Sequence, residues 1–244
     1  MIWTDERKRK VLDHLKKVNE ELQKALDAVA QRNTADAADH ILDAVTEKHA
    51  AVDDFPPIDL AGGKTISMGG LFQFLEKKDM FVTMALYAGS TDQLWWLRPT
   101  VIDALSALIS QVEGLLAREW INPECVDILR KLEEKLKQLK SFLEIGVAGN
   151  KEVWELAGDI RKYQAELLDT AYGDKDHGMS EVVLGLIDLD SRLAGVLDKL
   201  TEWQHQQDAK TESGPDTALY LKNILDIAKE NKEEIEKKIR AFAY

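Results

Sequence analysis

The sequence predicts an all-α protein, a single bundle of about seven or eight helices that are mostly antiparallel neighbours, with one long irregular loop near residues 53–70. Apolar residues recur in alternating steps of three and four along most of the 244 residues, and this spacing places them on one side of a helix. No segment alternates polar and apolar residues as a half-buried strand does, so we expect no sheet.

Each expected helix has its own apolar seam. The seams span residues 11–29, 97–115, 129–143, 153–167, 182–203 and 221–242. Between the first two of these seams, a further helix is expected at residues 71–86, just after the long loop.

Capping residues mark several of the boundaries. Asn122 followed by Pro123 is typical of a helix start, because proline at the first helical position gives up no hydrogen bond. Gly146 is a typical helix end, which makes the helices on either side of it antiparallel neighbours. Pro99 interrupts a helical pattern, so we expect a kink or a restart there. Ser180 is expected to cap the helix that follows it.

The long loop carries four large apolar residues, Ile58, Leu60, Ile66 and Met68, which a free linker would leave in water. We therefore expect it to pack across the bundle, and we expect one domain over residues 1–244. The alternative is an N-terminal helical hairpin, residues 1–52, that leans on a main bundle, residues 71–244.

The composition argues against several classes of protein and of partner. The chain has 32 basic and 44 acidic residues, a net charge of -12, which argues against nucleic-acid binding. No stretch is apolar enough to span a membrane, and the first residues lack an apolar signal region, so a soluble, cytoplasmic protein is expected. The single cysteine, Cys125, has no partner for an internal disulfide and is expected to fill core space.

The acidic excess is regional. Residues 34–72 contain two basic and seven acidic groups, and residues 151–214 contain seven basic and fourteen acidic groups. If these regions lie side by side, they form an acidic surface that attracts a basic partner protein and speeds its association.

The best candidates for an interaction surface are Trp95, Trp96 and Arg98, with Trp120 nearby in the sequence. Adjacent residues point about 100° apart on a helix, so two neighbouring tryptophans cannot both face one core. Tryptophan and arginine are enriched among residues that dominate binding energy at protein interfaces. This segment therefore indicates a partner contact.

A second candidate is the segment 168–178, which carries Asp169, Asp174, Asp176 and His177 on a turn that contains two glycines. Carboxylates that converge on a turn suit a hard divalent cation. These eleven residues resemble the aspartate-rich loop of the nucleotide-binding subunit of dihydroxyacetone kinases. The resemblance implies that Asp169, Asp174 and Asp176 hold magnesium ions that bridge the phosphates of a nucleotide.

Histidines and carboxylates also gather on other expected helices. A di-iron centre in a bundle needs a Glu-x-x-His motif on two helices, and only Glu202 and His205 form one here. Glu202 and the carboxylates between residues 36 and 49 are therefore expected to face water.

Together these features favour a non-enzymatic helical protein of the immunity, inhibitor or adaptor type, which binds another protein through an acidic surface and a tryptophan-containing patch and holds no cofactor. One alternative is a magnesium-dependent nucleotide-binding or phosphoryl-transfer domain. The other is a self-associating structural protein whose seams pair between chains.

Overall fold

In a computed structural model, the described part of the chain comprises residues 3–90, 96–146, 151–173 and 178–208, with single positions between 219 and 237. It confirms the all-α prediction, although most of the seam at 221–242 lies outside the described residues. The elements are α1 (Asp5–Ala30), α2 (Thr34–Asp53), β1 (Ile58–Asp59), η1 (Ala61–Gly63), β2 (Thr65–Ile66), α3 (Met68–Ser90), α4 (Arg98–Leu116), α5 (Glu124–Ile145), α6 (Lys151–Tyr172) and α7 (Gly178–Asp208).

The chain divides into two compact units, of which one spans Pro57–Glu181 and the other combines Ile2–Pro56 with Val182–Tyr244. The single domain expected over residues 1–244 stays a prediction.

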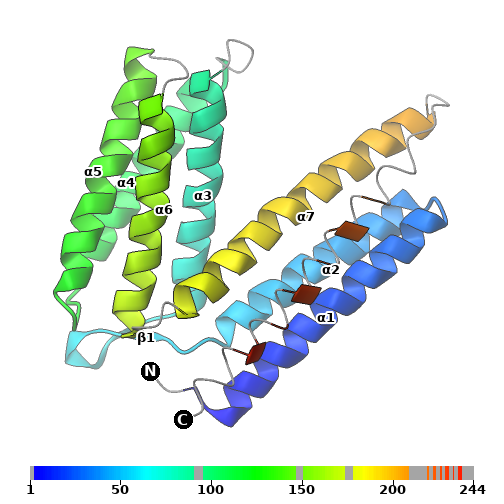
Figure 1. Cartoon of the computed structure of the whole chain (residues 1–244), viewed down its shortest axis with the longest axis horizontal. Helices are drawn as coiled ribbons and strands as arrows, with labels where there is room; N and C mark the ends of the chain where they lie inside the picture. The colour runs from blue at the N-terminus through cyan, green and yellow to red at the C-terminus, as the bar shows by residue number, and fades with distance from the viewer. Residues whose placement is uncertain are drawn as a thin grey trace. The chain divides into compact units, whose positions relative to one another are not determined.

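The first unit is an antiparallel four-helix bundle formed by α3, α4, α5 and α6 (Figure 1). Lys135 binds Asp159, at 2.9 Å, and the ammonium of Lys131 lies 5.8 Å from the ring centre of Tyr163, contacts that run in opposite directions along α5 and α6. The seams predicted for these helices supply the core, which includes Val101, Leu105, Leu108, Val112, Leu129, Leu132, Leu136, Leu139, Leu143, Val153, Leu156, Ile160 and Leu167.

The long loop packs on the same unit. All four of its large apolar residues, from Ile58 to Met68, are buried, as expected. The loop contains a hairpin in which β1 pairs antiparallel with β2, a small sheet that the sequence did not predict because two-residue strands are too short to show alternation. The backbone N–H of Ala61 donates to the carbonyl of Glu119 at 2.8 Å, which ties the loop to the segment between α4 and α5.

The predicted helix boundaries are mostly confirmed. Pro99 lies in the first turn of α4, so the helix restarts there. The side chain of Asn122 accepts a hydrogen bond from the N–H of Glu124 at 3.0 Å, and α5 begins at Glu124, one residue later than expected. Gly146 ends α5 in the left-handed conformation, with φ at 81°. Ser180 is an exception, because α7 begins at Gly178 and Ser180 lies inside its first turn.

In the second unit α1 and α2 form a helical hairpin joined by a turn at residues 31–33. Thr4 caps α1 through the N–H of Arg7, and Asn33 caps α2 through the N–H of Asp36, each at 3.2 Å. The apolar faces of α1, α2 and α7 share one core cluster, which contains Val18, Leu22, Ala25, Ala28, Val29, Ala37, Ile41, Ala44, Leu189, Leu193, Val196 and Leu200.

Two glycines of the four-helix bundle should respond in opposite ways to alanine. Gly146→Ala should lower the free energy of unfolding by about 1 kcal/mol, because a Cβ is disfavoured at its positive φ. Gly158→Ala should raise it by about 0.5 to 1 kcal/mol, since Gly158 is inside α6 and an added Cβ meets no atom within 4 Å. Urea unfolding followed by circular dichroism measures both, and changes of equal sign would contradict the assignment.

Candidate functional site

Three of the most exposed large apolar side chains belong to one end of the four-helix bundle. Trp96 is 72% exposed, Ile145 is 75% exposed and Trp154 is 57% exposed. Trp96 precedes α4, Ile145 is the last residue of α5, and Trp154 lies in the first turn of α6. We call these three residues the bundle-end cluster.

A hydrogen bond fixes this end of the bundle. The guanidinium of Arg98 donates through Nη2 to the carbonyl oxygen of Glu144 at 2.6 Å, which joins the start of α4 to the last turn of α5. Trp96 is two residues before Arg98, and Ile145 directly follows Glu144. The helix α6 runs antiparallel to α5 (Figure 1), so its first turn, which contains Trp154, lies at the same end of the bundle.

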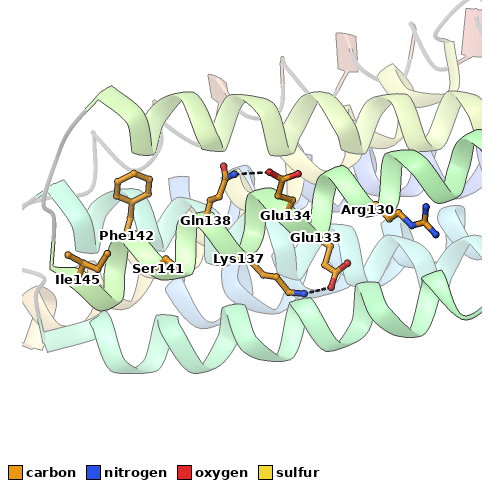
Figure 2. A pocket seen from close by; sticks show the side chains of 8 residues that line it. All are labelled: Arg130, Glu133, Glu134, Lys137, Gln138, Ser141, Phe142 and Ile145. Carbon is orange, nitrogen blue, oxygen red and sulfur yellow. Dashed lines mark hydrogen bonds and ion pairs between the residues drawn. The ribbon is translucent and has the colours of Figure 1, made fainter.

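An open groove of about 520 Å³ follows the outer face of α5 (Figure 2). Its lining residues recur at steps of three and four, which is one face of the helix. Phe142 and Ile145 form its apolar end, where it meets the bundle-end cluster. Further along, Lys137 binds Glu133, and the amide of Gln138 donates to Glu134 at 3.0 Å. These polar groups are already paired within the helix.

The structure separates the predicted interaction residues. Trp96 and Arg98 lie at the bundle end, whereas Trp120 follows the opposite end of α4 and is buried. The indole N–H of Trp120 donates to the carbonyl of Leu115 at 2.9 Å, so this side chain belongs to the interior and not to an exposed surface. Trp95 lies outside the described residues.

Sequence reasoning missed two members of the bundle-end cluster. Trp154 directly follows Val153, a member of the buried seam, and so must face away from it by about 100°. Ile145 stands two residues after Leu143, the last seam position of α5, and is likewise off the seam. A search for large apolar residues outside each seam would have found both.

Asp169 is buried near the end of α6 and contacts the start of α7. Its carboxylate accepts hydrogen bonds from the backbone N–H of Ser180 at 3.1 Å and from the Ser180 hydroxyl at 3.0 Å. A carboxylate is stabilised at a helix N-terminus, where the backbone N–H groups lack partners within the helix. Asp174 and Asp176 lie outside the described residues, so magnesium binding by the three aspartates stays a prediction.

Two further cavities lie in the first unit. One, of about 490 Å³, is lined by Lys77 and Arg118 among residues of the loop, α3 and α4. The other, of about 260 Å³, is lined by Cys125 and Tyr172 beside β1. Burial, with the charge of Glu124, raises the pKa of Cys125 to about 11, so its thiol is protonated at neutral pH and is a weak nucleophile. The expectation that Cys125 is buried is confirmed.

Lys78 on α3 is a buried cation inside the four-helix bundle. Its ammonium donates to the side-chain oxygen of Gln164 on α6. Burial lowers the pKa of Lys78 to about 8, with Asp79 opposing and Arg161 adding to the shift. Lys78 lines none of the three cavities above, so it has no route to a substrate within them.

Comparison with models of known protein families, with curated proteins and with solved structures finds no match to this chain. Among the described residues, no helix combines the length and the apolar character needed to cross a bilayer.

Lys78 should make stability depend on pH. Its folded pKa of about 8 lies below its ordinary 10.5, so between these values the unfolded chain binds a proton that the folded chain lacks. The free energy of unfolding should therefore rise by on the order of 3 kcal/mol from pH 8 to pH 10.5, and Lys78→Met should remove this rise.

The exposed neighbour Lys77 supplies the matched control for this measurement. Lys77→Met should leave the pH profile of urea unfolding unchanged, so that the difference between the two variants isolates Lys78. Parallel profiles for the two variants would show that Lys78 keeps an ordinary pKa in the folded chain.

Proposed function

We propose that this chain is a non-enzymatic protein-binding module of the immunity, inhibitor or adaptor type. It holds a basic partner protein on the bundle-end cluster and the adjoining groove of α5. The observation that carries the proposal is that Trp96, Ile145 and Trp154 are each more than half exposed at one end of a bundle whose seams are otherwise buried.

The chemistry of this end suits an interface. Complete burial of one large apolar side chain contributes about 1.5 to 3 kcal/mol, so three of them supply a binding centre. Ion pairs within the helices border the cluster, Lys140 with Glu144 at 3.5 Å and Lys151 with Glu155 at 3.2 Å. An apolar centre within a ring of polar groups is the usual anatomy of a protein interface.

Charge favours a different protein over a second copy of this chain. With a net charge of -12, two copies repel each other, whereas a basic partner is attracted. The groove follows one helix face at steps of three and four, which suits an amphipathic helix of the partner. Within the acidic region at residues 34–72, Asp36, Asp39 and Asp43 of α2 are exposed.

Paired variants test the proposal. The double variant Ile145→Ser, Trp154→Ser removes two members of the cluster, and Leu42→Ser, Ile121→Ser removes two large apolar residues exposed elsewhere. The immobilised proteins are incubated with an extract of the cells that make the chain, and any captured protein is purified for affinity measurement. We expect a basic protein that binds the native chain and the control, and binds the cluster variant at least about thirtyfold more weakly.

Two outcomes would contradict the proposal. The first is capture of the same proteins by all three chains, or of none. The second is a concentration-dependent dimer, seen by light scattering, that only the cluster variant loses, since this result would establish self-association instead. Circular dichroism checks that each variant is folded.

A further inference from the structure

The α1–α2 hairpin carries two histidine–glutamate pairs in one antiparallel register. His14 of α1 contacts Glu47 of α2, with Nδ1 and Oε2 2.5 Å apart. Glu21 of α1 contacts His40 of α2, with Oε2 and Nδ1 2.7 Å apart. A further carboxylate approaches each pair. Asp54 faces the other ring nitrogen of His14, with Nε2 and Oδ2 3.6 Å apart, whereas Asp43 gathers with Glu21 and His40 into a group of three donors.

Glu21, His40 and Asp43 lie close together. One donor atom from each of them lies within 4.8 Å of the other two, and no second group of three such donors occurs in the part of the chain that the structure describes. His40 and Asp43 are three residues apart and share one face of α2, while Glu21 faces them from α1. Two helices therefore supply the donors.

Two charged side chains border the three donors, Lys24 and Asp36. The ammonium of Lys24 contacts Oε1 of Glu21 at 2.6 Å, and the other carboxylate oxygen, Oε2, contacts His40. The other ring nitrogen of His40, Nε2, lies 4.0 Å from a carboxylate oxygen of Asp36. Histidine ligands of metals commonly have a carboxylate on the outer nitrogen, where it orients the ring.

We propose that Glu21, His40 and Asp43 form a binding site for a divalent transition-metal ion of the zinc type. One imidazole and two carboxylates suit Zn²⁺ or Co²⁺, whereas Mg²⁺ and Ca²⁺ prefer oxygen ligands alone. Three protein ligands leave one tetrahedral position for water. The site is independent of the bundle-end cluster.

The required geometry is close to what the structure shows. Donor atoms about 2.0 to 2.1 Å from zinc are about 3.3 Å from one another in a tetrahedral site. Glu21 and His40 need to separate slightly from 2.7 Å, and the exposed side chain of Asp43 approaches by rotation. On binding, Nδ1 of His40 presents its lone pair to the metal, and any proton it carries is released to water. The bound ion would clamp α1 to α2.

Zinc titration of the full chain by calorimetry tests the site, with Co²⁺ absorption as the spectroscopic readout. We expect one strong site per chain and a higher midpoint of thermal unfolding with Zn²⁺, but no such shift with Mg²⁺ or Ca²⁺. His40→Gln and Asp43→Asn should each weaken zinc binding, the first by at least about a hundredfold, because they remove a direct ligand. The matched controls are His14→Gln, which breaks the other pair, and Asp39→Asn, which removes an exposed carboxylate of α2.

The proposal is overturned if the native chain binds no zinc below millimolar concentration, or if the His40 and Asp43 variants keep the affinity of the native chain. It is also overturned if His14→Gln loses as much affinity as His40→Gln. Asp43→Asn keeps the test valid should His40→Gln fail to fold, since Asp43 is exposed. None of these results depends on the partner protein.

Discussion

An amphipathic helix buries only one stripe of side chains, and this constraint governs both units of the protein. In the four-helix bundle, seams such as that from Leu129 to Leu143 fill the interior and use up the apolar residues of each helix. A large apolar residue off the seam then has to face water or a partner. The bundle-end cluster stands out for this reason, because the seams beside it are complete without it.

The same constraint explains the buried polar groups. Lys78 and Asp169 lie at positions that face the interior, and each is held by a partner from another segment, Gln164 for the lysine and Ser180 for the aspartate. A buried charge without such a partner would cost several kcal/mol. Asp169 thus joins the end of α6 to the start of α7, a structural role that the aspartate-rich pattern did not indicate.

The helices and most of their ends were predictable from the sequence, since they follow from periodicity and capping, which are local. Pro99 and Gly146 show this, because each acts on its own backbone. The candidate sites depend on which helix ends meet, and local patterns do not contain that information. Trp120 resembles Trp96 in the sequence, yet one is interior and the other exposed, because α4 carries them to opposite ends. Glu21 and His40 meet only because the turn at residues 31–33 sets the register of α1 against α2.

We propose that the bundle end, and not exposed apolar surface in general, binds a partner. Site-specific photo-crosslinking in living cells tests it most directly, with the photoreactive residue at position 154 and, in a second protein, at position 121, which is exposed elsewhere on the same unit. We expect one discrete adduct with a different, basic protein from position 154 and none from position 121. No adduct, equal adducts from both positions, or an adduct between two copies of the chain would contradict it.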